Sequence, residues 1–315
     1  MTPLHLHKEL IRLRRSEELL AALYKGQQMA TPAHFAVGQE GIAVGVCAAL
    51  DRTKDVVFAA HRSHYAYLAS GGSFEALCAE LYGRETGCSK GRGGSVHLTH
   101  RSTGFIISSA ILGETIAVAA GAALSFKMNK EKRVAVCFFG EAAMEEGIVY
   151  EVFNFAAIHK LPLLLVCENN SYSTESPLEV RQPEGTELCD RAVMFRVGAF
   201  KVDGNDVVAV HKMAIKALAH VRAGQPVLIE ATTYRWLEHV GPFTDQEQGR
   251  TYRPQAELEQ WQANDPLLVS SDNLAMNWPE IERYDAEIQV ELKAAADRAY
   301  AAPMPDRSAL FENVW

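Results

Sequence analysis

The sequence predicts an α/β fold in which helices cover both faces of a central, mostly parallel β-sheet. Short apolar runs at 56–59, 134–139, 163–167 and 226–233 have the length and character of buried strands. Segments that are rich in Ala and Gly, or that repeat apolar residues at helical spacing, separate these runs. Strands that alternate with helices are typical of parallel sheets, so we expect the runs to lie in one sheet.

Composition favours a cytoplasmic chain with neither a nucleic-acid nor a membrane partner. The 315 residues are 48% apolar and 22% charged, and the net charge is −8. An acidic chain without a long basic run lacks the features of a nucleic-acid binder, and no apolar segment approaches the roughly 20 residues of a membrane span. The amphipathic start of the chain has no signal-peptide core, and six cysteines without a CxxC pair favour free thiols. We expect a single domain over 1–315, with a helical C-terminal extension from about 256 to 315.

Two segments between the helices of the first half carry basic residues. The predicted helices cover 4–26, 38–50, 73–84 and 113–127. After the first strand, Ala60-His61-Arg62-Ser63-His64 is a candidate phosphate-binding segment, although the segment alone favours a solvated turn. The Gly-rich loop 88–97 matches neither the Walker pattern nor GxGxxG, so it predicts no nucleotide site. Its glycines allow a close backbone approach, its basic residues would tolerate an anion, and His97 is interpreted as a structural histidine.

The stretch from Arg133 to Tyr172 is predicted to form one βαβ unit. An apolar run, Val134–Phe139, is followed by a turn at Gly140 and by a segment with helical spacing of apolar residues. A second apolar run follows and ends in Glu168-Asn169-Asn170. The crossover is expected to be right-handed. Both strands then end at the same edge of the sheet, where open α/β proteins bind ligands.

Glu141 and Asn170, at these two strand ends, are candidate magnesium ligands. Carboxylate and amide oxygens with nearby carbonyls form the hard ligand set of Mg²⁺, which usually completes its shell with phosphate oxygens and water. The helix predicted to begin near Met144 would direct backbone N–H groups at an anion in the same place. The spacing fits a metal-bridged diphosphate. It fits equally well a polar strand end at which Glu145 and Glu146 stabilise the helix start.

The last part of the chain supplies one more candidate residue. Residues 171–189 are polar and predicted to form an exposed loop. An edge strand and turn at 199–206 end in Asp206, which is placed to cap a helix over 207–223. The strand at 226–233 then leads to His239, which by itself is more often a core or capping histidine than a catalytic one.

Seven segments occur in an order that resembles one known family over nearly the whole chain. They are GQEGIAVGVCAAL, AAHRSHYAYLASGG, SKGRGGSVHL, SAILGETIAVAAGAAL, the GEA…ENN unit, KVDGNDVVAV and ATTYRWLEH. The family is the alpha subunit of the thiamine-diphosphate-dependent first component of 2-oxo-acid dehydrogenase complexes, including the pyruvate, branched-chain and acetoin types. The resemblance implies a thiamine-diphosphate-binding fold and an enzyme that decarboxylates a 2-oxo acid and transfers the acyl group to a lipoyl acceptor.

The resemblance also implies which residues bind the cofactor thiamine diphosphate and its Mg²⁺. The cofactor-binding residues would be His61, Arg62, Ala110, Leu112, Gly140, Glu141, Ala142, Ala143, Asn170 and Tyr172. Glu141, the Asn170 side chain and the Tyr172 backbone carbonyl would hold Mg²⁺. Arg62 would contact the diphosphate together with His61, which stands where the family more often has tyrosine.

Further positions match residues that act near the reacting atoms. The Ala110 carbonyl would accept a hydrogen bond from the cofactor's amino group, and Leu112 would hold the cofactor in its bent shape. His64 and His239 match two active-site histidines that stabilise charge on the substrate and pass protons. A histidine can do both near neutral pH.

The chain departs from the family pattern at the metal motif and in one loop. Glu141 stands in place of Asp, and its extra methylene shifts the carboxylate by about one bond length. Ala142 stands in place of Gly and restricts the backbone away from positive φ. The loop 240–245 lacks the serine that usually follows the second histidine, which suggests a changed substrate or acceptor.

In this family the glutamate that activates the cofactor comes from a separate beta subunit, and this chain is long enough only for the alpha part. We therefore expect an α2β2 assembly with a beta chain, a small 2-oxo acid as substrate and a lipoyl acyltransferase as a further partner. Two alternatives stay open: a transketolase-like or carboligating subunit of a biosynthetic pathway, motivated by loop 240–245, and a non-catalytic partner subunit, motivated by Glu141 and Ala142.

Overall fold

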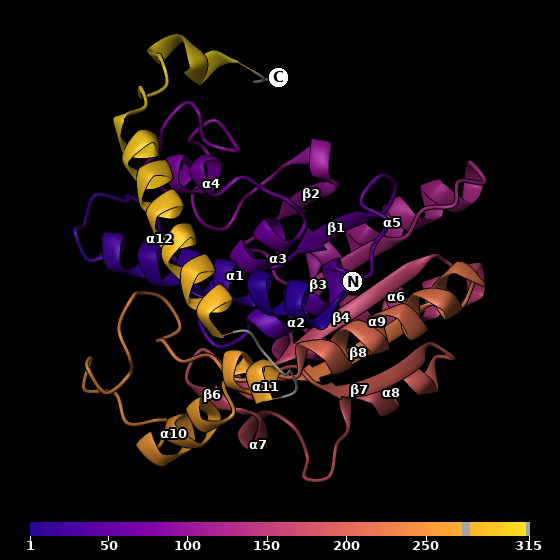
Figure 1. The fold of residues 1–315 in the computed structure, drawn as a ribbon. Coiled ribbons are helices and arrows are strands. Elements are labelled where there is room, and N and C mark those ends of the chain that lie inside the picture. The colour runs from indigo at the N-terminus through magenta and orange to yellow at the C-terminus, as the bar shows by residue number, and fades with distance from the viewer. Residues whose placement is uncertain (273–277, 313–315) are drawn as a thin grey trace.

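A computed structural model describes residues 1–272 and 278–312 of the chain. Its centre is a six-stranded, wholly parallel sheet in the order β2-β1-β3-β4-β8-β7 (Figure 1). The strands are β1 (Val56–Ala59), β2 (Phe105–Ser108), β3 (Ala135–Gly140), β4 (Leu163–Asn169), β7 (Gly198–Asp203) and β8 (Val227–Thr232), with a separate hairpin of β5 (Tyr172–Ser173) and β6 (Ser176–Pro177). The predicted fold class is confirmed.

Helices cover both faces of this sheet, as expected. The helices are α1 (Pro3–Tyr24), α2 (Glu40–Cys47), α3 (His64–Ala69), α4 (Phe74–Leu81), α5 (Glu114–Met128), α6 (Gly147–His159), α7 (Leu178–Arg181), α8 (Leu188–Met194), α9 (Val207–Arg222), α10 (Gln255–Ala263), α11 (Pro266–Asp272) and α12 (Trp278–Ala301). The short 3₁₀ turns are η1 (Arg101–Thr103), η2 (Glu141–Glu145) and η3 (Arg307–Phe311). Within the described part of the chain, no helix combines the length and the apolar character that a membrane crossing requires.

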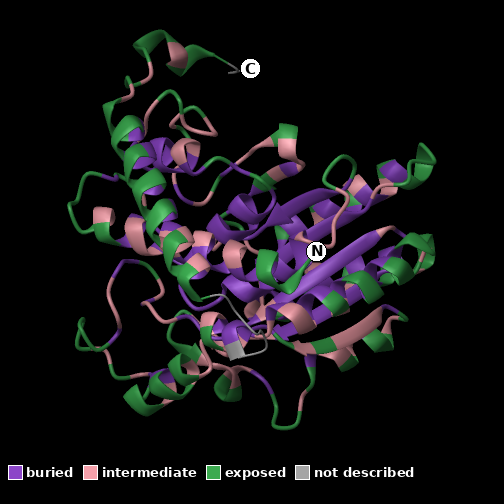
Figure 2. Cartoon of the chain, viewed as in Figure 1, coloured by how far each residue is buried: buried purple, intermediate pink, exposed green. Residues whose placement is uncertain are grey.

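Alternate residues of the strands enter two separate apolar cores. Val57, Val136 and Leu164 pack with α1, α2, α9 and α12, whereas Val56 and Ala135 pack with α5, α6 and α8. Successive strand residues point to opposite faces, so an all-apolar run can supply both cores at once. The central strands are accordingly buried, whereas the edge strand β7 is partly exposed and the outer helix faces are exposed (Figure 2).

The strand register brings the predicted site segments to one edge of the sheet. Gly140 of β3 pairs with Glu168 of β4, and Asn169 of β4 pairs with Thr232 of β8. On the other side of β3, Ala59 of β1 pairs with Phe138. Because the strands are parallel, the segments that follow β1, β3, β4 and β8 all leave the sheet at its carboxyl edge.

Several local elements differ from the prediction. Helix α6 begins at Gly147 rather than near Met144, because the 3₁₀ turn η2 occupies Glu141–Glu145. No strand was predicted at 105–108 and no helix at 64–69, but the edge strand β2 and helix α3 occupy these residues. The expected cap is confirmed: Asp206 Oδ1 accepts from the backbone N–H of Val208 at 3.0 Å and of Ala209 at 2.9 Å. Residues 273–277 and 313–315 of the predicted C-terminal extension lie outside the described residues.

The Gly-rich loop binds an anion that belongs to this chain. The buried Glu80 of α4 accepts four backbone hydrogen bonds, from Ser89 and Gly91 at 2.7 and 2.9 Å and from Gly93 and Gly94 at 2.7 and 3.2 Å. Gly91 and Gly94 have φ of +72° and +57°, which glycine adopts without strain. The loop therefore wraps a carboxylate rather than a ligand.

Glu80→Gln is expected to lower the free energy of unfolding by about 3 kcal/mol. The substitution keeps the shape but directs an NH₂ group at backbone donors, and each buried donor left without an acceptor costs about 1–3 kcal/mol. Urea unfolding measures the loss. Glu85→Gln, between α4 and the Gly-rich loop, changes an exposed carboxylate and is the matched control. An equal effect of both variants would contradict this role of Glu80.

Candidate functional site

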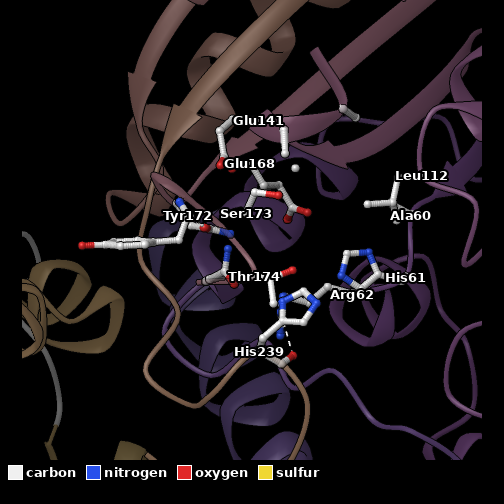
Figure 3. Close-up of a pocket in the computed structure, with 15 residues that line it drawn as sticks. Ala60, His61, Arg62, Leu112, Glu141, Glu168, Tyr172, Ser173, Thr174 and His239 are labelled. Atoms are coloured by element: carbon white, nitrogen blue, oxygen red, sulfur yellow. Dashed lines mark hydrogen bonds between the residues drawn. The ribbon is translucent and has the colours of Figure 1, made fainter. Parts of the chain in front are cut away.

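A cavity lies at the carboxyl edge of the sheet and encloses about 630 Å³ of empty space, open solvent included. Its lining residues are Gln39, Ala60, His61, Arg62, Leu112, Gly140, Glu141, Ala142, Ala143, Glu168, Asn170, Tyr172, Ser173, Thr174 and His239. All the residues predicted to bind the cofactor or to be catalytic line it, except His64 and Ala110. Glu141 and Glu168 lie at one side, and Arg62, His61 and His239 gather at the other (Figure 3).

Glu141 and Asn170 are neighbours, as the βαβ unit predicts. The backbone N–H of Asn170 donates to the buried Glu141 carboxylate. The Asn170 side-chain oxygen accepts from the backbone N–H of Tyr172 at 3.1 Å. Together with the Tyr172 carbonyl, these groups supply oxygen ligands of the kind that Mg²⁺ prefers. Ala142 is not among the residues with positive φ, so replacing Gly with Ala causes no backbone strain here.

Arg181 forms an ion pair with Glu141, the candidate metal ligand. Its Nη2 donates to Glu141 Oε1 at 2.6 Å, and its Nη1 pairs with Glu145. Burial raises the pKa of Glu141 while the Arg181 guanidinium counteracts this rise. The segment 171–189 was predicted to be an exposed loop, but it contains β5, β6 and α7 and places Arg181 on the candidate metal ligand. Arg181 and Glu141 are 40 residues apart, so neither helical nor strand periodicity in the sequence predicts that they pair.

Arg62 leaves the end of β1 and is held by carbonyl oxygens. It donates to Phe35 O and, at 3.1 Å, to His239 O. Burial lowers its pKa to about 9, so the guanidinium is still charged at neutral pH. Two neighbouring side chains have polar atoms without a hydrogen-bond partner among the described residues: Gln39 Oε1, and both ring nitrogens of His61. A cationic group beside unpartnered polar atoms is suited to a polar, anionic ligand such as a diphosphate or a carboxylate.

Three histidines from different segments meet beside Arg62. The rings of His34 and His61 are 4.5 Å apart between centroids, and those of His34 and His239 are 5.1 Å apart. Burial, and next the charge of Arg62, lower the pKa of His61 and of His239 to about 3, and the pKa of His34 falls for the same reasons. All three imidazoles are therefore neutral at pH 7. Sequence analysis missed His34, which follows the first helix in a loop without any motif of its own.

The comparison with known proteins decides the family. The family model described as "Dehydrogenase E1 component" matches residues 8–308. The chain belongs to the dehydrogenase E1 component family. A rice (Oryza sativa subsp. japonica) protein, "Pyruvate dehydrogenase E1 component subunit alpha-1, mitochondrial", is 35% identical over 309 residues, which cover 96% of this chain and 77% of that protein.

Two further relatives carry alpha-subunit names. "Pyruvate dehydrogenase E1 component subunit alpha" of Zymomonas mobilis is 34% identical over 316 residues, covering 99% of this chain and 88% of the relative. The protein of that name from Porphyra purpurea is 34% identical over 317 residues, covering 97% and 90%. The resemblance to alpha subunits of 2-oxo-acid dehydrogenases is thus confirmed.

Two predicted site residues of this E1 component lie outside the cavity. His64 is wholly buried: its Nδ1 contacts Glu17 Oε1, and its Nε2 is 2.8 Å from Ser95 Oγ. Glu17 also accepts from the backbone N–H of Ala36 at 2.7 Å, so this network ties α1 to the Gly-rich loop and to the segment that contains His34. Ala110 is exposed in the β2–α5 connection. The catalytic role of His64 and the cofactor contact of Ala110 stay predictions.

Glu168 is a cavity residue to which sequence analysis assigned no role. It belongs to β4 and lies opposite Gly140 in the sheet. Burial raises its pKa to about 8, although the charge of Arg62 acts in the opposite direction. A carboxyl that holds its proton at pH 7 can donate or exchange it at a reacting group. In the sequence, Glu168 stands out only as an acidic residue at the end of an apolar run.

Glu168→Gln is expected to abolish one component of the pH dependence of stability. The folded chain keeps this proton up to about pH 8, whereas an ordinary glutamate releases it near 4.5. Between these values the folded state binds more protons than the unfolded state, so wild-type stability falls as pH rises. In urea unfolding, the free energy of unfolding of the variant relative to that of the wild type should be higher at about pH 8 than at about pH 5. Glu151→Gln, which replaces an exposed carboxylate, is the control. A difference in the free energy of unfolding between Glu168→Gln and the wild type that is the same at both pH values would contradict the raised pKa.

Proposed function

We propose that this chain is the alpha subunit of a thiamine-diphosphate-dependent enzyme that decarboxylates a 2-oxo acid and passes the acyl group to a lipoyl acceptor. The observation that carries the proposal is the cavity at the sheet edge. It gathers an oxygen-rich corner at Glu141 and Asn170, a charged Arg62 and neutral histidines. The names of the relatives, all pyruvate dehydrogenase E1 alpha subunits, support the same reaction class.

The residues present fit the cofactor and Mg²⁺. Glu141, Asn170 and the Tyr172 carbonyl would hold Mg²⁺ once Arg181 releases its oxygen of Glu141. Backbone N–H groups near Ala142, together with Arg62, would bind the diphosphate. The bound cofactor supplies the carbanion and the electron sink, and the chain supplies orientation and charge.

The remaining cavity residues would handle the substrate and its protons. His239 and His61 are neutral, so each can accept a proton or a hydrogen bond, and an anionic ligand nearby would raise their pKa. Glu168 keeps a proton that it can donate. Leu112, on the cavity wall, would support the bent cofactor. Apart from the activating glutamate, the residues that line the cavity supply the groups that these roles require.

A beta subunit would supply that glutamate and complete the site. Ile111 is 61% exposed and Ile107 is 39% exposed, and the two flank Ala110 at the edge of this chain. Exposed apolar side chains next to a ligand cavity suit a surface that a second subunit covers. The α2β2 assembly, the lipoyl acyltransferase and a cytoplasmic location belong to the same proposal.

One observation favours a second candidate, a non-catalytic partner subunit. The Arg181 guanidinium already neutralises the carboxylate that would bind Mg²⁺. The transketolase-like or carboligating alternative rests on the loop 240–245 of the sequence alone.

Assays on the chain co-purified with its beta chain distinguish these functions. Calorimetry with thiamine diphosphate and Mg²⁺ should show saturable binding, and CO₂ release from a 2-oxo acid should depend on an added lipoyl domain. Release that depends on aldehydes instead would favour carboligation. Absence of cofactor binding in the assembled complex would overturn the proposed function and favour the non-catalytic subunit.

A further inference from the structure

The cluster of His34, His61 and His239 has the composition of a metal site. His34 comes from the α1–α2 connection, His61 follows β1 and His239 follows β8. Each of the three can offer one ring nitrogen such that all three nitrogens lie within 4.8 Å of one another. His34 Nδ1 and both nitrogens of His61 are buried and have no hydrogen-bond partner among the described residues. Buried polar atoms normally have partners, so these free lone pairs point to a ligand.

The ring spacing fits three imidazoles around one tetrahedral ion. Zn–N bonds are about 2.0–2.1 Å long, which puts the ring centroids of three coordinated histidines about 5 Å apart. The centroid separations are 4.5 Å for His34 and His61, 5.1 Å for His34 and His239, and 5.6 Å for His61 and His239. Nitrogens around one Zn²⁺ are about 3.4 Å apart. Small ring rotations therefore suffice to bring the three nitrogens onto one ion.

We propose that His34, His61 and His239 bind a transition-metal dication of the Zn²⁺ class through one ring nitrogen each. Neutral imidazole suits Zn²⁺, Co²⁺ and Ni²⁺, whereas Mg²⁺ and Ca²⁺ prefer oxygen. The site is therefore chemically distinct from the oxygen ligands at Glu141 and Asn170, on the other side of the cavity (Figure 3). Two of the three histidines line the cavity, so the fourth position of the ion would face it.

The positive charges of two guanidinium groups favour an anionic ligand at that fourth position. Arg62 and Arg235 act on His61 and His239 electrostatically, and their positive charge opposes a bare dication. An anionic fourth ligand, hydroxide or chloride, reduces this repulsion. Arg62 Nη2 lies 3.5 Å from His239 Nδ1 but 3.1 Å from His239 O, so the long contact to the ring is the one that metal binding can replace. Bound metal would take the lone pair of His239 that proton transfer requires, which makes it an inhibitor of the proposed reaction.

Titration of the full-length chain with Zn²⁺ or Co²⁺, without thiamine diphosphate, tests the proposal. We expect one ion per chain, measured for Zn²⁺ by competition with a chelating dye. For Co²⁺ we expect the strong visible absorption of a four-coordinate complex. His61→Phe keeps an aromatic ring but removes the ligand, and should lower the affinity by about 100-fold, because even outer-shell changes cost 10–100-fold. His34→Phe should behave in the same way.

Two controls separate this site from other metal binding. His97→Phe replaces an exposed histidine outside the cluster and should leave the Zn²⁺ affinity unchanged. Glu141→Gln should also leave it unchanged, because the oxygen site is separate. Circular dichroism confirms that each variant is folded. The proposal is overturned if Zn²⁺ does not bind, if bound Co²⁺ lacks the four-coordinate spectrum, or if both His→Phe variants bind Zn²⁺ as tightly as the wild type. Each outcome counts whatever the test for cofactor binding shows.

Discussion

Replacing Glu141 with Gln is expected to weaken Mg²⁺-dependent binding of thiamine diphosphate by about 100-fold or more. The carboxylate is the only charged oxygen in the predicted ligand set, and it is 1% exposed, so water cannot easily take its place. The amide keeps the size of the side chain but loses the charge that balances Mg²⁺. Calorimetry with Mg²⁺ and thiamine diphosphate in the assembled complex measures the change.

Glu145→Gln is the matched control for this loss. Glu145 lies on the same 3₁₀ turn and pairs with the same arginine, but it does not line the cavity. Its substitution should leave the cofactor affinity within about threefold, as is usual for an exposed ion pair. If both glutamine variants lost affinity equally, Glu141 would have no special role as a ligand.

Arg181→Gln is expected to raise the Mg²⁺ affinity about tenfold and to make stability dependent on Mg²⁺. The guanidinium–carboxylate pair must open before a metal can use Glu141 Oε1, and a charge-assisted hydrogen bond of this kind contributes about 1.5–3 kcal/mol. Without Arg181 the buried carboxylate lacks a counter-charge, which costs about 3–5 kcal/mol when no metal is bound. Thermal unfolding with and without Mg²⁺ should show a low midpoint that the metal restores.

A neighbouring arginine provides the comparison for Arg181. Arg191 donates to Met144 O at 3.2 Å and to Gln182 Oε1 at 2.8 Å, and it makes no contact with Glu141. Arg191→Gln should change stability without any response to Mg²⁺. A loss of Mg²⁺ binding in Arg181→Gln would instead mean that the arginine helps to hold the metal site together, contrary to the competition described above.

The edge of the sheet could be predicted because local rules determine it. Apolar runs predict the strands, and a helical crossover makes the two strands parallel with their carboxyl ends at the same edge, so Glu141 and Asn170 meet as expected. The helix start was wrong by several residues because a 3₁₀ turn and an α-helix have similar apolar spacing. For the Gly-rich loop, the sequence predicted a close backbone approach and tolerance of an anion. It did not predict that Glu80 is the group approached, because no local pattern pairs Glu80 with the loop.

The sequence by itself determined the fold class, the family and most of the wall of the cavity. Only the tertiary structure decided which polar side chains meet there: Arg181 pairs with Glu141, Glu168 is buried so that its pKa rises, and His34 packs against His61. The physical reason is that periodicity encodes burial within one element, whereas electrostatic pairing depends on distances between elements. Those distances exist only after the parallel strands have aligned their ends.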